Sequence, residues 1–277
     1  MATTQAERGA IFRDLHFGGH LLILGSPWDA GSARLLAGLG FEALATSSAG
    51  LAFSLGRRDG AGQVSREEVL SNAAAIVEAS GLPVTAELDC GYGATAEEAW
   101  RAIHDAARVG LVGASIEDRS GDPEAPVLPL EQAVERIRAA AEAVRGLGFP
   151  FMLCARTENF IVGRADIDDT LRRLKAYAEA GADVLYAPGV IQRDQILAVV
   201  RAVAPKPVNV LVGIPGLQMS LEGLFELGVR RVSVGSSLAR VAYGAFYHAA
   251  SELARRHSLQ SLRQAMSHER INDLFLH

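Results

Sequence analysis

Short apolar runs alternate with amphipathic segments along the whole chain. Seven of these runs follow a helical pattern that ends at or near a glycine, or in one case a proline, and an eighth stands at the front. In chain order they cover residues 21–24, 43–46, 84–86, 112–116, 151–153, 183–186, 207–211 and 229–234. A glycine there supplies the left-handed cap that lets a helix turn back into a strand. Eight strands alternating with helices predict a (β/α)8 barrel.

A doubly wound open sheet is the competing topology. Both folds have strands that are apolar throughout, because helices cover the sheet on each side. The first run, however, is followed by no G-x-G-x-x-G sequence, and the chain contains no Walker A sequence. These absences favour the barrel.

The sequence also predicts where two helices start and that the C-terminal segment is helical. Ser65 with Glu68 predicts a capping box that opens a helix over 69–80, and Thr95 with Glu98 opens the next one. We expect one domain over residues 1–277, in which about 237–277 forms C-terminal helices. The apolar contacts expected in its last piece are Leu262, Met266, Ile271 and Leu274. This piece is either a subunit interface or a closure of the barrel floor.

Composition limits the classes of partner. Hydrophobic residues make up 49% of the 277 residues and charged ones 21%, as in ordinary soluble proteins. A net charge of -5 gives no reason to expect nucleic acid or an anionic membrane as a partner, so a small molecule is expected. The N-terminus has no signal pattern, no apolar run approaches roughly 18 residues, and two cysteines are too few for a disulfide framework. We expect a cytoplasmic protein with two thiols.

Acidic residues gather where three of the predicted strands end. Glu87 and Asp89 alternate on one side of the third strand, and Glu117 follows the fourth. In a barrel all three meet at the active-site rim. Neighbouring carboxylates repel unless they are protonated or bridged by a cation, and an oxygen-only set favours Mg²⁺ or Mn²⁺. The alternative is that Glu87 and Asp89 pair with a Lys or Arg of a neighbouring strand.

One arginine stands among these acids. Arg156 ends the fifth strand, where its guanidinium could hold a substrate carboxylate through two hydrogen bonds. A rim salt bridge to Glu158 or Glu117 is the alternative, and both can hold at once. A Ser/His/Asp hydrolase is a poor rival, because none of the seven histidines lies at a predicted strand end, and we expect them on the surface.

Six stretches, in order, resemble the isocitrate lyase and phosphoenolpyruvate (PEP) mutase superfamily. Residues 25–33 resemble its P-G-x-x-D-x-x-S-A stretch, 46–51 its S-G-A-G-L loop, 55–59 its L-G-x-x-D, 87–93 its D-A-D-T-G-Y-G, 116–118 its I-E-D and 155–158 its A-R-T-D. The resemblance implies a barrel that binds Mg²⁺ and a 2-oxo acid or its enolate. It also implies a tetramer with exchanged C-terminal helices.

The resemblance assigns roles to individual residues. Asp89 matches the direct metal ligand, while Glu87, Glu117 and Asp59 match carboxylates that act on the metal mainly through its waters. Substrate-binding positions are Trp28, Ser47, Ser48, Ala49, Asp89, Arg156 and, by a looser match, Asn209. Of all these, Arg156, Glu117 and Asp59 are the predicted catalytic residues.

The chain departs from the family pattern in its lid. Residues 119–129 replace the lyase K-K-C-G-H sequence and contain no Lys, Cys or His, which counts against isocitrate or methylisocitrate lyase activity. The mutase lid residues also have no counterpart, Glu87 replaces an aspartate, and Pro188 stands where lyases have a glutamate.

Three functional hypotheses follow. The first is a Mg²⁺-dependent lyase or hydrolase that cleaves a C–C bond of a small 2-oxo dicarboxylate such as oxaloacetate through a metal-stabilised enolate. The second is P–C bond chemistry on phosphonopyruvate or a PEP-like substrate. The third is a protein that binds 2-oxo acids without turning them over.

Overall fold

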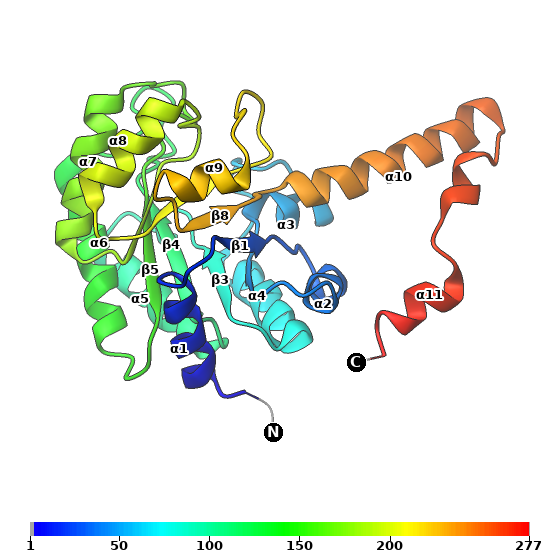
Figure 1. The fold of residues 1–277 in the computed structure, drawn as a ribbon, viewed down its shortest axis with the longest axis horizontal. Helices are drawn as coiled ribbons and strands as arrows, with labels where there is room; N and C mark the ends of the chain where they lie inside the picture. Colours follow the sequence, from blue (N-terminus) through cyan, green and yellow to red (C-terminus); the bar gives the residue numbers. More distant parts are fainter. Residues whose placement is uncertain (1–2, 277) are drawn as a thin grey trace.

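Eight parallel strands close into a barrel in the computed structural model, which describes residues 3–276 (Figure 1). They are β1 (Leu22–Gly25), β2 (Ala43–Ala45), β3 (Val84–Glu87), β4 (Gly113–Glu117), β5 (Met152–Arg156), β6 (Val184–Tyr186), β7 (Val208–Leu211) and β8 (Arg231–Ser233). Pairing of Leu22 in β1 with Arg231 in β8 closes the ring. The predicted barrel is confirmed, because an open sheet would leave these two strands unpaired.

Helices surround the barrel on its outer side. They are α2 (Ala30–Gly38), α3 (Ser48–Ser54), α4 (Arg66–Ser80), α5 (Ala96–Arg108), α6 (Leu130–Arg145), α7 (Ile167–Ala180), α8 (Arg193–Val203) and α9 (Leu221–Glu226). Both predicted capping boxes are present, at Ser65 with Glu68 and at Thr95 with Glu98. Helix α4 begins at Arg66 rather than at residue 69, because the helix starts directly after its capping serine.

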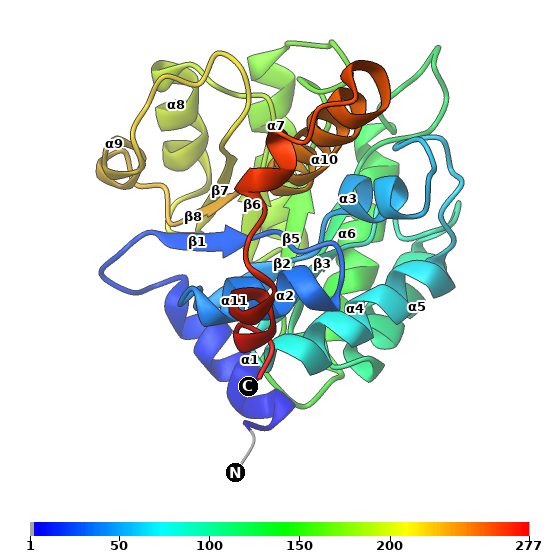
Figure 2. The ribbon, with the colours of Figure 1, turned by 90° about the vertical axis from the view of Figure 1, so that its right-hand side faces the viewer.

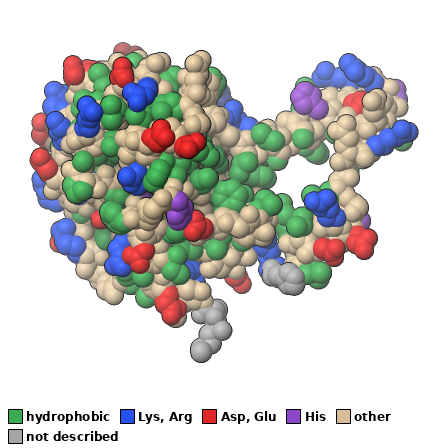
Figure 3. Space-filling view, viewed as in Figure 1, with side chains coloured by type: hydrophobic (Ala, Val, Ile, Leu, Met, Phe, Trp, Pro, Cys, Tyr) green, Lys and Arg blue, Asp and Glu red, His purple; other side chains and the backbone are tan. Residues whose placement is uncertain are grey.

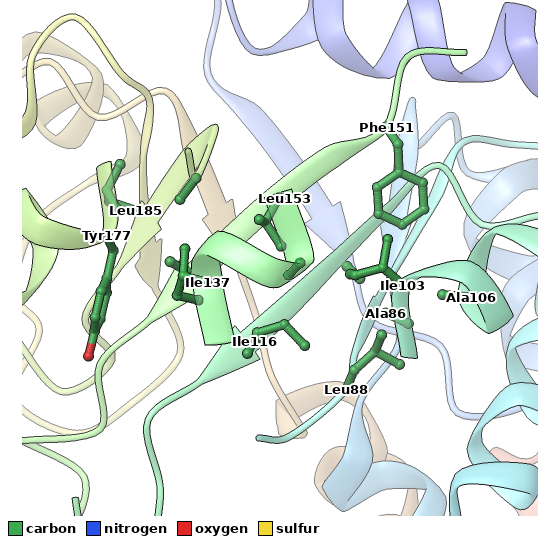
Figure 4. Close-up of a cluster of buried hydrophobic side chains, with 14 of the residues drawn as sticks. Ala86, Leu88, Ile103, Ala106, Ile116, Ile137, Phe151, Leu153, Tyr177 and Leu185 are labelled. Carbon is green, nitrogen blue, oxygen red and sulfur yellow. The ribbon is translucent and has the colours of Figure 1, made fainter. Parts of the chain in front are cut away.

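The hydrophobic core has two layers. One lies between strands and helices, where Leu88, Ile103 and Ile116 pack together (Figure 4). The other fills the barrel interior, where Phe12 of α1 (Gln5–Leu15) contributes to a cluster with Leu22 and residues of the other strands. Helix α1 therefore closes the N-terminal end of the barrel and leaves the opposite end for a site.

His16 is buried beneath the barrel, so the expectation that all histidines lie on the surface is wrong for this residue. Its Nδ1 lies 2.7 Å from the carbonyl oxygen of Phe12, and its Nε2 lies 3.4 Å from a guanidinium nitrogen of Arg231. Burial and the charge of Arg231 lower the pKa of His16 to about 3. The imidazole is therefore neutral and accepts a hydrogen bond from Arg231.

Replacing His16 by glutamine is expected to reduce the loss of stability in acid. The unfolded chain takes up the proton near pH 6.5 and the folded protein only near pH 3, so this contribution to stability is complete above pH 6.5 and is lost as the pH falls. Between pH 7 and pH 5 the wild type should lose about 2 kcal/mol more unfolding free energy than the variant. Urea titrations at both pH values measure this, and equal losses would contradict it.

A C-terminal arm leaves the barrel. Helix α10 (Ser237–Arg256) projects away from it, and a 3-10 turn (Ser261–Gln264) and α11 (His268–Asp273) lead back toward α2 (Figures 1 and 2). The four apolar residues predicted as contacts are each 39–49% exposed. The arm does not close the barrel floor, because α1 occupies that end. No helix within residues 3–276 is long and apolar enough to cross a membrane.

Candidate active site

A cavity of about 260 Å³ opens at the C-terminal ends of β3, β4 and β5. Its charged lining residues are Arg58, Asp59, Asp89, Glu117, Arg119 and Arg156. They come from the loop after α3 and from the ends of three adjacent strands, as the parallel arrangement requires. The predicted rim cluster of acids with one arginine thus exists, and two further arginines stand beside it.

Glu87 is held by three hydrogen bonds. Its Oε2 accepts from the backbone N–H and the hydroxyl of Ser48, both at 2.9 Å, and its Oε1 accepts from Arg156 at 3.0 Å. The alternative that this acid pairs with an arginine of a neighbouring strand is therefore correct for Glu87. The donors of Ser48 that were predicted for a substrate carboxylate serve Glu87 instead. Ser47 is buried, and its hydroxyl caps α3 by accepting from the N–H of Gly50.

Arg156 is the central cation of the site. Besides Glu87 it contacts Glu117, at 3.4 Å, and Glu158, and its guanidinium lies 5.3 Å from the centre of the Tyr186 ring. Burial opposes its charged form, but Glu117 and Glu158 outweigh burial and hold the pKa of Arg156 well above its ordinary value. Both predicted salt bridges of Arg156 are present. Its Nη2 makes no hydrogen bond within residues 3–276, so one arm of the guanidinium is left for a ligand.

Asp89 has no ion-pair partner in the described part of the chain. Its backbone lies in the left-handed region, with φ of 45°, which costs energy for a residue with a side chain and is typical of functional sites. Burial and the nearby Glu87 raise the pKa of Asp89 to about 6, although Arg156 counteracts them. Its carboxylate therefore faces the cavity without a neutralising contact.

The other acids of the cavity also resist ionisation. Burial, followed by the charge of Glu87, raises the pKa of Asp59. Burial also raises the pKa of Glu117, and the charge of Glu158 adds to that effect while Arg156 opposes it. A divalent cation would relieve this repulsion.

A buried network behind the cavity fixes the loop after β5. Asp118 accepts a hydrogen bond from the backbone N–H of Glu158 at 2.8 Å and pairs with Arg173 at 3.1 Å. Tyr177 donates its hydroxyl to the same carboxylate at 2.5 Å. This network holds Glu158 in place against Arg156. Buried oxygens of Glu158 and Tyr92 nevertheless find no hydrogen-bond partner among the described residues.

The donor set fits a hard divalent cation. Within residues 3–276 no three His, Cys, Asp or Glu side chains converge as a ready set of ligands. Mg²⁺ does not require such a set, because it usually keeps several waters and binds through one or two carboxylates. The unpaired Asp89, with Glu87, Glu117 and Asp59 around it, provides oxygen atoms of that kind. The buried hydroxyl of Tyr92, which lines the cavity and has no hydrogen-bond partner among the described residues, is a second sign that a group belongs here.

Four predicted substrate-binding residues, Trp28, Ser47, Ala49 and Asn209, do not line the cavity. Asn209 is buried inside the barrel, where its amide donates to Ser233 and accepts from Arg231, both at 3.0 Å. Both of its polar atoms thus have partners inside the barrel, and the side chain is only 1% exposed. Trp28 lines a separate surface cleft beside α3 and packs against Gly50. Of the 47–49 segment, Ser48 alone lines the cavity.

Sequence reasoning gave no role to some residues of the cavity. Arg58, Tyr92 and Arg119 line it. The position of Arg119, directly after the Glu117-Asp118 pair, is a signal that could have identified it. Nothing in the pattern around Arg58 distinguishes it from Arg57, which pairs with Glu68 outside the cavity.

Known proteins are similar to this chain over most of its length. The family model described as phosphoenolpyruvate phosphomutase matches residues 12–254. An oxaloacetate decarboxylase from Pseudomonas putida is 29% identical over 241 residues, which cover 85% of this chain and 81% of that protein.

Two solved structures are similar over nearly the whole chain. A Burkholderia cenocepacia protein, provisionally described as a lyase/mutase, is 49% identical with a TM-score of 0.95, covering 99% of this chain and 97% of that one. A structure of oxaloacetate acetylhydrolase with the product oxalate is 25% identical with a TM-score of 0.87, covering 99% and 95%. The chain therefore belongs to the phosphoenolpyruvate phosphomutase family, within the isocitrate lyase and PEP mutase superfamily, and is an enzyme of that type.

Proposed function

We propose that this enzyme cleaves a C–C bond of a small 2-oxo dicarboxylate, oxaloacetate or a close analogue, with Mg²⁺ or Mn²⁺ as cofactor. The observation that carries the proposal is the half-buried carboxylate of Asp89, which has no ion-pair partner within residues 3–276, beside the cationic Arg156 at the mouth of the barrel. A 2-oxo acid has the complementary groups, a carboxylate and a carbonyl. Relatives named oxaloacetate decarboxylase and oxaloacetate acetylhydrolase support the choice of substrate.

Asp89, the acids around it and Arg156 each have a part in this reaction. Asp89 would hold the cation, with Glu87, Glu117 and Asp59 acting through its waters, and the cation would withdraw electrons from the substrate carbonyl. Arg156 binds and orients the substrate carboxylate through its free Nη2, while Glu87 and Glu158 keep its guanidinium in place. Water supplies the proton that replaces the departing group, because segment 119–129 contains no Lys, Cys or His.

The test is an assay of purified protein with oxaloacetate, with and without Mg²⁺. Pyruvate and carbon dioxide would identify decarboxylation, and oxalate with acetate would identify hydrolysis. The proposal expects one of these product pairs and its loss when EDTA removes the metal. Turnover of phosphonopyruvate alone would favour P–C chemistry. Metal-dependent binding of 2-oxo acids in calorimetry, without any product, would favour the non-catalytic hypothesis.

We also propose that the C-terminal arm joins copies of this chain, as a dimer or a tetramer with exchanged C-terminal helices. Hydrophobic side chains line the opening between the arm and the barrel (Figure 3). On α10, Val241 is 70% and Phe246 is 72% exposed, which is unusual for a helix that has no partner. In the assembly, the arm of another copy would cover the exposed apolar side chains of α10.

Replacing Phe246 by glutamate is expected to dissociate the assembly, because it places a charge in an apolar contact. Light scattering should give a multiple of the chain mass for the wild type and a smaller mass for the variant. Phe17→Glu is the matched control, since Phe17 is 64% exposed but lines a cleft with Phe149 and Pro207, which contains no residue of the arm. A monomeric wild type, or equal behaviour of both variants, would contradict the proposal.

A further inference from the structure

Within residues 3–276, two arginines at the mouth of the cavity have no counter-ion. Arg119 follows β4 directly, and Arg58 lies in the loop after α3, and both line the cavity. Neither side chain makes a hydrogen bond or an ion pair within the described residues, whereas Arg156 contacts three carboxylates. Arginines without partners beside Asp59, Asp89 and Glu117 need a reason, because pairing with one of these acids would be the simplest arrangement.

The structure fixes the position of Arg119. Its backbone pairs with Val127 in an antiparallel bridge, and the N–H of Ser120 donates to the carbonyl of Pro126 at 3.0 Å. Asp118 also accepts, through its carbonyl, from the N–H of Leu128 at 2.8 Å. The segment that replaces the family lid is therefore a short, hydrogen-bonded loop, and Arg119 stands at its base.

The guanidinium of Arg119 reaches across the cavity mouth to the loop after α3. Its two terminal nitrogens lie 3.3 and 3.4 Å from the place where a Cβ on Gly60 would be. A side chain at Gly60 would press on the guanidinium, and the φ of 70° there also disfavours one. The charge of Arg119 reaches Asp59 and Asp89, since it counteracts the rise of both pKa values. Arg119 thus faces the same space as the metal-binding acid.

This placement matters for a substrate with two anionic groups. In any 2-oxo acid a carboxylate stands next to a carbonyl. Arg156 would bind that carboxylate, and the cation held by Asp89 would bind the carbonyl oxygen. A second carboxylate, one carbon further on, would meet Glu117 and Asp59 unless a cation received it. Arg119 is such a cation, and its planar guanidinium can bind a carboxylate through two parallel hydrogen bonds.

We propose that Arg119 recognises the distal carboxylate of the substrate and so selects 2-oxo dicarboxylates over 2-oxo monoacids. The inference rests on the proposed function and deepens it, because it names the residue that sets the substrate class. Segment 119–129 contains no Lys, Cys or His to act as an acid or base. The proposal gives this segment a role in substrate binding instead.

The test measures binding by calorimetry in the presence of Mg²⁺, so that it does not depend on turnover. The probes are pyruvate, a 2-oxo monoacid, and 3,3-difluorooxaloacetate, a 2-oxo dicarboxylate. Arg119→Gln should weaken binding of the dicarboxylate about 10- to 100-fold, the usual value of a hydrogen-bonded contact between charged groups. The affinity of this variant for pyruvate should change less than about twofold, because pyruvate has no distal carboxylate to lose a contact.

Two further variants serve as controls. Arg138→Gln removes the same charge from the exposed outer side of α6 and should change neither affinity. Arg119→Lys should keep part of the preference, because it retains the charge and loses the planar geometry. In activity assays Arg119→Gln should raise the KM for oxaloacetate much more than it lowers kcat.

Several outcomes would overturn the inference. A wild type that binds both probes equally, or an Arg119→Gln variant that weakens both to the same degree, would show that Arg119 does not select the distal group. An effect confined to Arg58→Gln would move the assignment to that arginine. If the wild type bound neither probe, the proposed function itself would fail, and this result is distinguishable from the others.

Discussion

Replacing Asp89 by asparagine is expected to lower Mg²⁺-dependent turnover of oxaloacetate by roughly 10³-fold, because a cation that polarises the carbonyl contributes several kcal/mol. Asparagine keeps the shape of the side chain and tolerates the positive φ of 45° at this position, so the backbone should not change. Alanine at the same position should lose at least as much activity. Turnover equal to that of the wild type would contradict the role of Asp89.

The same substitution separates a ligand role from a structural one. In the folded protein the pKa of Asp89 is raised to about 6, so this group stabilises the fold below the unfolded pKa of about 3.9 and loses that contribution as the pH rises through 6. At pH 7 and without metal, the asparagine variant should therefore be more stable than the wild type, by about 3 kcal/mol.

Magnesium should reverse this order. Addition of Mg²⁺ should raise the Tm of the wild type and leave that of Asp89→Asn unchanged, because only the wild type has the charged oxygen ligand. Thermal unfolding with and without Mg²⁺ measures both effects. A variant that is less stable than the wild type without metal would indicate a structural role for Asp89 instead.

Replacing Arg156 by methionine is expected to destabilise the protein by about 3–5 kcal/mol, the usual cost of leaving a buried charge without its partner. Arg156 faces Glu87, Glu117 and Glu158, and the side chain of Glu158 is only 1% exposed. Lowering the pH to 5 should not recover this loss through Glu117, because burial already raises the pKa of that acid to about 8. Activity should also be lost, because Arg156 would no longer bind the substrate carboxylate.

Two controls make this prediction specific. Arg156→Lys should recover part of the unfolding free energy, since it restores the charge, but little activity, since an ammonium group does not have the fork that holds Glu87 and a ligand together. Arg193→Met removes an arginine whose side chain is 65% exposed and should change stability by less than about 0.5 kcal/mol. Denaturant titrations at pH 7 and pH 5 measure all three variants.

Local patterns were sufficient to predict most of the fold. The capping serine of α4 and the glycine that ends it each lie directly beside the helix in sequence, and Gly81 has the left-handed conformation that its position required. The strands follow from short apolar runs for the same reason, since strand and helix boundaries depend on hydrogen bonds and sterics between nearby residues. The prediction that Glu87, Asp89, Glu117 and Arg156 share one rim followed from the parallel arrangement alone.

Contacts within the rim could not be predicted in this way. The alternation of side chains suggested that Glu87 and Asp89 act as a pair, but β3 ends at Glu87 and the chain turns at Asp89. Glu87 then reaches Ser48 and Arg156, and Asp89 is left to the cavity. His16 and Asn209 were misplaced for the same reason, because both meet Arg231, which is distant in sequence.

The order of residues was therefore enough to establish a closed barrel, its family and the set of acids at its mouth. Folding in three dimensions was needed to settle which acid Arg156 neutralises, which acid stays unpaired and which arginines face the opening. Helix and strand signals act between residues a few positions apart, whereas an ion pair depends on distances of a few ångströms between separate strands and loops. Those distances follow from packing of the whole barrel, which no short stretch of sequence contains.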